Sequence, residues 1–216
     1  MAGQKTTIQP WADRHHFIAF ADATPDYEIR LGDSPPPSAT HECLLGQITQ
    51  ANTIVRPRLV CRDVDGREFV VALYAGGDDD AGMARLLKGF RVGHTVAIYY
   101  PVGHQFLDAS RGVRVEDTDK ILIMPLSLDN ALAMNEQAVE FVNRDATPRK
   151  CHGCGEAKQE LDKCARCALF HYCNRECQTK GWDSHKKYCK ALKDENIKKM
   201  LLFDHDNLNG SQISFH

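Results

Sequence analysis

Seven of the nine cysteines lie between Cys151 and Cys189, and this cluster constrains the chain more than any other feature. With one histidine they form the pattern C-x2-C-x9-C-x2-C-x5-C-x3-C-x7-H-x3-C, whose members are Cys151, Cys154, Cys164, Cys167, Cys173, Cys177, His185 and Cys189. Thiolate sulfur and imidazole nitrogen are the donors that Zn²⁺ takes in tetrahedral structural sites. Eight such donors predict two four-coordinate, structural zinc ions.

This zinc module is expected to be a scaffold and not a reaction centre. A segment of about 40 residues buries too little apolar surface to fold unaided, so metal binding is expected to supply its folding free energy. The spacing puts Cys173 and Cys177, and also His185 and Cys189, on one face of a short helix each. With four protein ligands per ion, no position stays open for water or substrate, which argues against a catalytic zinc.

Charge and hydropathy narrow the classes of partner. The net charge is −2, divided into −4 for residues 1–150 and +2 for residues 151–216. Nucleic-acid binding is therefore disfavoured, because it usually requires a basic footprint. No apolar run approaches the roughly 18 residues that span a bilayer, and no secretory signal is evident. A reducing compartment, the nucleus or the cytoplasm, is therefore expected, where clustered cysteines are more often metal ligands than disulfides.

Residues 42–145 have the pattern of a mostly β domain. Apolar runs over 43–55, 57–62, 68–74, 93–100, 112–115 and 121–124 predict strands, with Asp65-Gly66 as a hairpin turn. A short helix is expected over 83–88, ending at Gly89. Three strands, a helix and further strands are the element order of a small OB-like barrel, with an SH3-like barrel as the main alternative. An amphipathic helix over 128–142 is expected to complete this domain.

The remaining segments fall outside that domain. Residues 1–41 are expected to form an N-terminal arm with a proline-rich linker or surface loop at 32–38. Residues 146–203 are expected to hold the zinc module and a following helix with an apolar stripe. Residues 204–216 are expected to form a flexible tail.

Around the cysteines, the pairs Tyr172-Cys173 and Cys177-Gln178 and the Trp182-x-x-His185 spacing resemble the MYND zinc finger. The resemblance covers every ligand position and about a fifth of the chain. It implies two interleaved sites, the first formed by Cys151, Cys154, Cys173 and Cys177. The second would consist of Cys164, Cys167, His185 and Cys189.

The same resemblance implies a protein-interaction module that takes up short proline-containing peptides. The peptide groove would be lined by Phe170, Gln178 and Trp182, beside a strand over 168–171. An aromatic wall suits proline or leucine, and a strand edge offers backbone hydrogen bonds. In the alternative interpretation, Trp182 packs against the zinc core and Gln178 caps a turn.

We therefore expect a non-enzymatic adaptor in which a small barrel is joined to a MYND finger. The alternative is a nucleic-acid-associated factor whose barrel binds single strands while the finger recruits a partner. Arginines gathered on one barrel face would favour it. Aromatics such as Tyr74 and Phe106 are the residues that such a face would use to stack bases, but strand aromatics are more often core residues. A lysine methyltransferase is not expected, since the segments flanking the finger leave no room for a split SET domain.

Overall fold

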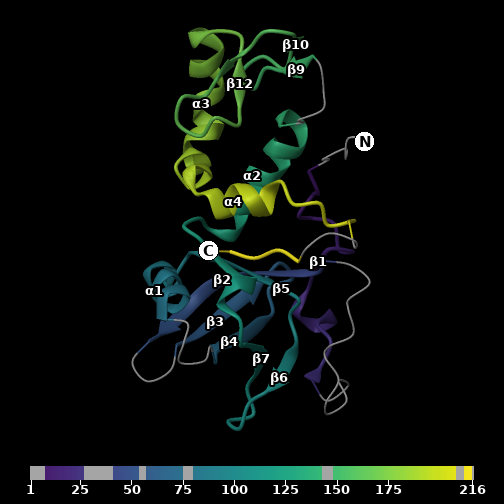
Figure 1. Ribbon diagram of the computed structural model, residues 1–216, viewed down its shortest axis with the longest axis vertical. Helices are drawn as coiled ribbons and strands as arrows, with labels where there is room; N and C mark the ends of the chain where they lie inside the picture. Colours follow the sequence, from purple (N-terminus) through teal and green to yellow (C-terminus); the bar gives the residue numbers. More distant parts are fainter. Residues whose placement is uncertain are drawn as a thin grey trace. The chain divides into compact units, whose positions relative to one another are not determined.

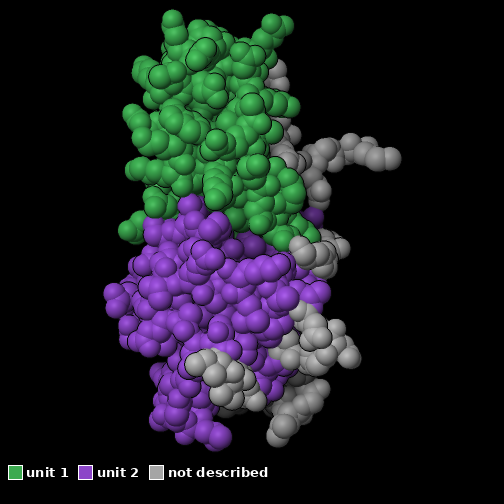
Figure 2. Space-filling model, turned by 90° about the vertical axis from the view of Figure 1, so that its left-hand side faces the viewer, with its two compact units in different colours: residues 1–11, 129–204 green, residues 12–128, 205–216 purple. Residues whose placement is uncertain are grey.

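The structure is a computed structural model that describes residues 8–26, 41–53, 57–74, 80–142, 148–207 and 212–215. The chain divides into two compact units, which are coloured separately in Figure 2. Residues 12–128 and 205–216 form the sheet unit, and residues 1–11 and 129–204 form the finger unit. Among the described residues, no helix is both long and apolar enough to cross a bilayer.

A mixed sheet of eight strands organises the sheet unit (Figure 1). The order is β6-β7-β4-β3-β2-β5-β8, and β1 pairs in parallel with β2. The strands are β1 (Phe17–Ile18), β2 (Cys43–Asn52), β3 (Arg58–Asp63), β4 (Glu68–Leu73), β5 (Thr95–Tyr99), β6 (Gly103–Gln105), β7 (Arg111–Val115) and β8 (Ile121–Met124). Helix α1 (Asp80–Gly89) connects β4 to β5 and ends at the predicted glycine.

The predicted Asp-Gly hairpin joins β3 to β4, and Gly66 adopts a φ of +81° in its turn. Just before the turn, Asp63 is 3% exposed, and its Oδ1 accepts backbone hydrogen bonds from Asp65 (3.0 Å) and Arg67 (2.8 Å). Its Oδ2 accepts the backbone N–H of Phe20 at 3.0 Å. One buried carboxylate therefore fixes the turn and also binds the backbone of Phe20.

Strand β2 is 10 residues long and pairs irregularly with β3. A register shift lies between Ile48 and Gln50 in its pairing with β3. A Cβ atom at Gly46 would lie 2.7 Å from the Cζ atom of Phe69, so glycine here makes room for a core ring. The core of this unit consists of Leu44, Ile48, Leu59, Cys61, Phe69, Val71, Leu73, Leu86, Phe90, Val96, Ile98, Val113, Val115 and Ile121.

The expected barrel is not closed by hydrogen bonds within the described part of the chain. Strand β4 pairs in parallel with β7, while β5 pairs with β2 on one edge and β8 on the other. Because both edges of β5 are occupied, β7 cannot pair with it to complete a ring. The segment between β7 and β8 contains the 3-10 helix η3 (Thr118–Lys120), which interrupts the ladder.

The finger unit contains more than the predicted zinc domain. Helix α2 (Leu128–Phe141) forms as the apolar periodicity predicts, but residues from 129 onward cluster with the finger instead of completing the sheet domain. The other elements are β9 (Arg149–Lys150), β10 (Ala157–Lys158), β11 (Asp162–Lys163), β12 (His171–Tyr172), α3 (Arg175–Cys189), η4 (Ala191–Lys193) and α4 (Glu195–Leu201). The predicted apolar stripe after the finger is buried at Leu192, Ile197, Met200 and Leu201.

Within the tail expected over 204–216, the described residues from His205 onward belong to the sheet unit, and three of them are buried. His205, Ile213 and Phe215 are each at most 1% exposed. The Tyr99 hydroxyl and the His205 Nε2 lie 2.9 Å apart, and the Phe215 N–H donates to the Asp119 carbonyl at 2.9 Å. These partners are distant in sequence, so local composition gives no sign of them. The proline run at 35–37 lies outside the described residues.

Candidate metal centre

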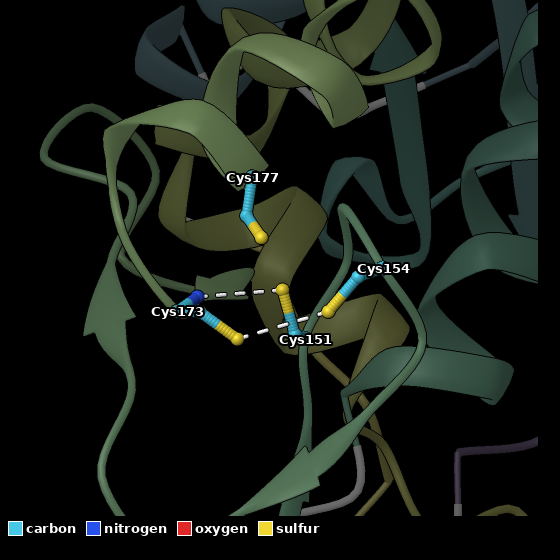
Figure 3. A group of neighbouring side chains, drawn as sticks. All are labelled: Cys151, Cys154, Cys173 and Cys177. Atoms are coloured by element: carbon cyan, nitrogen blue, oxygen red, sulfur yellow. Dashed lines mark hydrogen bonds between the residues drawn. The ribbon is translucent and has the colours of Figure 1, made fainter.

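Four thiols of the finger converge into one group, the four-cysteine cluster: Cys151, Cys154, Cys173 and Cys177. Their sulfur atoms all lie within 4.8 Å of one another and point into one space, as Figure 3 shows. Cys177 lies in the first turn of α3, where the Asn174 side chain caps the helix by accepting the Cys177 N–H at 2.9 Å. The N-cap therefore fixes the backbone that carries one of the four donors.

The backbone around Cys151 favours its thiolate form. The N–H groups of Gly153 (3.4 Å) and Cys173 (3.3 Å) both donate to the Cys151 sulfur. Burial acts to raise the pKa of this thiol, but backbone donors outweigh it and lower the pKa to about 6. A thiolate that is already stabilised by N–H donors is the form in which cysteine binds zinc.

The second set of donors, the cysteine–histidine cluster, consists of Cys164, Cys167, His185 and Cys189. All four residues are buried, and their ligand atoms lie within 4.8 Å of one another. The Sγ atoms of Cys164 and Cys189 are 3.8 Å apart, and the Sγ of Cys167 is 3.3 Å from the Nε2 of His185. Burial lowers the pKa of His185 to about 4, which keeps the imidazole neutral with a lone pair for a metal.

Both clusters fit zinc on the chemistry of their donors. Each offers four soft ligands from the protein, either four thiolates or three thiolates and one imidazole, which is the composition of closed structural sites. A zinc bound there would supply folding free energy and would have no vacant position. The structure brings together the same two sets of four residues that the resemblance implies.

The helical arrangement of these ligands differs from the prediction. One helix, α3, replaces the two short helices, and Cys173 precedes its N-cap residue. Cys177 at the start of α3 belongs to the four-cysteine cluster, whereas His185 and Cys189 near its end belong to the cysteine–histidine cluster. A single rigid element therefore connects the two metal sites.

The three predicted groove residues fall into two classes. Gln178 and Trp182 are partly exposed and lie one turn apart on α3. Phe170 is 0% exposed, and its ring packs 4.8 Å from that of His185 and 5.9 Å from that of Tyr188, so Phe170 belongs to the core and cannot line an open groove. The strand predicted over 168–171 shares only His171 with the observed strand β12, and Ala168 adopts a φ of +59°, outside the extended region.

Sequence reasoning missed one neighbour of Trp182 and two polar residues beside the cysteine–histidine cluster. The Arg166 guanidinium lies 5.9 Å from the centroid of the Trp182 ring. His152 and Tyr172 are 7% and 1% exposed, and the Tyr172 hydroxyl lies 2.7 Å from the Nδ1 of His185. In the sequence, the position of His152 between the metal-binding residues Cys151 and Cys154 was the signal that could have pointed to its place beside the metal centre.

Comparison with protein families identifies the class of this module. The family model described as MYND finger matches residues 151–189, so this part of the chain is a MYND finger. A MYND finger binds zinc, and the two clusters fit two structural zinc ions. Such fingers generally mediate protein–protein interactions.

The curated relatives are similar to this chain over a limited stretch. SET domain-containing protein 14 of Caenorhabditis elegans is 38% identical over 65 residues, which are 30% of this chain and 15% of the relative. The human histone-lysine N-methyltransferase SMYD1 is 42% identical over 43 residues, 20% of this chain and 9% of the relative. The SET domain and MYND-type zinc finger protein 6 of Schizosaccharomyces pombe is 46% identical over 44 residues, again 20% and 9%. This chain thus spans between 9 and 15% of the length of these relatives.

Among solved structures, the S. pombe Stn1-ten1 complex aligns with a TM-score of 0.31 and 14% sequence identity. The alignment covers 40% of this chain and 59% of the other. This likeness is too weak to support a conclusion about fold or function.

Proposed function

We propose that this chain is a non-enzymatic adaptor whose MYND finger captures short proline-containing peptide segments of a protein partner. The eight metal-type donors form two complete sets of four, which suits a scaffold better than a reaction centre. We also assign the chain to a reducing compartment, the nucleus or the cytoplasm, because none of the nine cysteines forms a disulfide bond.

The observation that carries this proposal is the partly exposed indole of Trp182 on α3. Its ring packs edge-on against His185, with centroids 5.6 Å apart, and Arg166 lies over it at 5.9 Å. Gln178 lies one turn earlier on the same helix and is also partly exposed. The indole is held in place by His185, a buried metal-binding residue, and can pack against a proline ring. The Gln178 amide and the Arg166 guanidinium beside it can donate hydrogen bonds to the peptide carbonyl groups next to that proline.

The test compares peptide binding with metal content in the same variants. Trp182→Ala should weaken binding to a panel of labelled proline-containing peptides at least about tenfold, since a central aromatic anchor typically contributes about 2 kcal/mol or more. Its zinc content should remain at two ions per chain, and Lys187→Ala, an exposed change on the same helix, should bind normally. Unchanged binding in Trp182→Ala, or a loss of zinc with the peptide, would refute the proposed groove.

A second candidate function rests on the sheet unit, which we propose is an OB-type barrel with an interrupted fifth strand. In this assignment β2, β3, β4 and β5 are the first four strands, and β7 with β8 form the two halves of the fifth. The observed order β7-β4-β3-β2-β5 is then barrel strands 5-3-2-1-4, and the pair between β4 and β7, strands 3 and 5, is parallel. Both features support the assignment. Such a barrel would make single-stranded nucleic acid the alternative ligand.

Two arginines on this sheet lie beside aromatic rings, which favours binding of nucleic acid, but both are paired with carboxylates, which weakens that case. The Arg58 and Arg114 guanidinium groups lie 5.6 Å and 4.3 Å from the ring centroids of Phe106 and Tyr74, an arrangement suited to stacking on bases. However, Arg58 is ion-paired to Asp108 (2.8 Å) and Arg114 to Glu116 (2.6 Å). Since these carboxylates compete with phosphate, we rank nucleic acid below a protein partner.

Salt-dependent binding of labelled single-stranded oligonucleotides to the full chain separates the two functions. An adaptor without a nucleic-acid function should show weak binding that Arg58→Ala and Arg114→Ala do not change. Micromolar binding that falls steeply with salt, and is lost in both variants, would favour the alternative.

A further inference from the structure

An unbroken line of four polar side chains leads from α2 to the cysteine–histidine cluster. Gln137 Oε1 lies 2.9 Å from the Nε2 of His152, and the other ring nitrogen of His152 lies 3.4 Å from the Tyr172 hydroxyl. The same hydroxyl lies 2.7 Å from the Nδ1 of His185. All four residues belong to the finger unit, but Gln137 lies outside the residues matched by the MYND family model.

The acceptor at the end of this line fixes the direction of every hydrogen bond in it. Because Gln137 Oε1 only accepts, His152 must donate from Nε2, and its Nδ1 is left as an acceptor. Tyr172 then donates its proton to His152 and accepts one from the Nδ1 of His185. His185 therefore carries its proton on Nδ1 and presents the lone pair of Nε2, the atom that lies 3.3 Å from the Cys167 sulfur.

Close packing holds the line in place. His152, Tyr172 and His185 are 7%, 1% and 0% exposed, and the His152 ring contacts those of Phe141 (4.9 Å) and Phe170 (4.5 Å). Gly181 of α3 makes room for it, since a Cβ atom there would lie 3.0 Å from the His152 Nδ1. These three residues are thus shielded from water, which would otherwise offer other partners to their polar groups, while Gln137 at the end of the line is partly exposed.

We propose that Gln137, His152 and Tyr172 are positioning residues that select the Nδ1–H tautomer of His185 and orient its Nε2 toward the second zinc. Helix α2 is then part of the metal centre, although it lies before the finger in sequence. Outer groups that hydrogen-bond a ligand imidazole typically contribute about 10- to 100-fold to metal affinity, so the effect is large enough to measure.

The experiment uses the full zinc-loaded chain and follows each metal site separately. Gln137→Leu removes the final acceptor, and Tyr172→Phe removes the hydroxyl next to His185. Both variants should release zinc from the cysteine–histidine cluster to a chelator about 10- to 100-fold faster than the unmodified chain, while release from the four-cysteine cluster stays unchanged. Alkylation and mass spectrometry identify the site, because Cys164, Cys167 and Cys189 become reactive only when the cysteine–histidine cluster opens.

Two controls distinguish positioning from general packing. Tyr188→Phe removes the hydroxyl of another buried tyrosine whose ring lies 5.6 Å from that of His185, and it should leave both release rates unchanged. Gln137→Glu keeps an acceptor at the end of the line and should restore slow release. Imidazole ¹⁵N spectra should show His185 bound through Nε2 and protonated on Nδ1 in the unmodified chain, with a weaker or exchanging Nδ1–H signal in Tyr172→Phe.

Three outcomes would overturn the inference. Equal acceleration at both clusters would indicate a general loss of stability. Unchanged release in Gln137→Leu and Tyr172→Phe would show that packing alone orients His185. Coordination through Nδ1 in the unmodified chain would contradict the assigned direction of the line.

Discussion

Asn135 on α2 holds the backbone of Trp11, which lies 124 positions earlier in the chain. Its Oδ1 accepts the Trp11 N–H at 2.7 Å, and its Nδ2 donates to the Gln9 carbonyl at 3.0 Å. Asn135 is 1% exposed, and Trp11 is 2% exposed. Residues 9–11 are therefore structural parts of the finger unit, so a fragment limited to the cysteine-rich segment would lack them.

Replacing this amide should destabilise the finger unit. Asn135→Leu keeps a similar volume but leaves a backbone N–H and a carbonyl without the Asn135 partner, which should cost about 1–3 kcal/mol. Chemical denaturation of the zinc-loaded chain, followed by far-UV circular dichroism, measures the free energy of unfolding. The adjacent exposed change Glu136→Leu should stay within about 0.5 kcal/mol, and an equal loss in both variants would contradict this role for Asn135.

Zinc should leave the two clusters in a fixed order. In the four-cysteine cluster, Cys154 is exposed and Cys173 and Cys177 are partly exposed, whereas all four residues of the cysteine–histidine cluster are buried. A chelator should therefore remove the zinc of the four-cysteine cluster first. Partial chelation followed by alkylation and mass spectrometry should label Cys154 before Cys164, and the opposite order would contradict the prediction.

Gly112 should tolerate no side chain, because β7 runs very close to β4 at this position. A Cβ atom there would lie 2.0 Å from the Val70 carbonyl oxygen, so Gly112→Ala must displace a paired strand. We expect a loss of about 1–3 kcal/mol in the stability of the sheet unit, the range typical of overpacked cores. Gly103→Ala on β6 is the matched control, because its nearest contact would be an ordinary 3.5 Å. Similar thermal unfolding of the two variants would contradict this prediction.

Phe215 should contribute to the stability of the sheet unit as a core residue does. The ring is 0% exposed and lies 5.9 Å from that of Tyr99, and the Arg85 guanidinium donates to the Phe215 carbonyl at 3.2 Å. Phe215→Ala should cost about 3–5 kcal/mol in the free energy of unfolding. Leu107→Ala, at a fully exposed apolar position, should change stability by less than about 0.5 kcal/mol. An unchanged free energy of unfolding in Phe215→Ala would show that residues 212–215 do not stabilise the sheet unit.

Local patterns in the sequence were sufficient for the elements whose signals lie within a few residues. The turn at Asp65-Gly66, the helix ending at Gly89 and the strands β7 and β8 agree with the sequence-based expectations. In each case the determining chemistry, a positive φ or an alternation of apolar side chains, is carried by neighbouring residues. The identity of the finger was likewise readable, because metal ligands must be cysteine or histidine at restricted spacings.

Long-range contacts decided the features that the sequence did not reveal. Phe170 is apolar enough for a groove or a core, and only the packing of His185 and Tyr188 around it makes it core. The order of strands and helix along the chain was predicted in outline, but the pairing of β8 with β5, which leaves no free edge for β7, depends on register between distant strands.

By itself, the sequence determined that this protein carries a MYND finger with donors for two zinc ions, since ligand chemistry is local and restrictive. The tertiary structure decided which further residues support that finger: Asn135 holding Trp11, and Gln137 reaching His185 through His152 and Tyr172. Hydrogen bonds between segments far apart in the chain leave no periodicity or spacing behind, so only their positions in space reveal them.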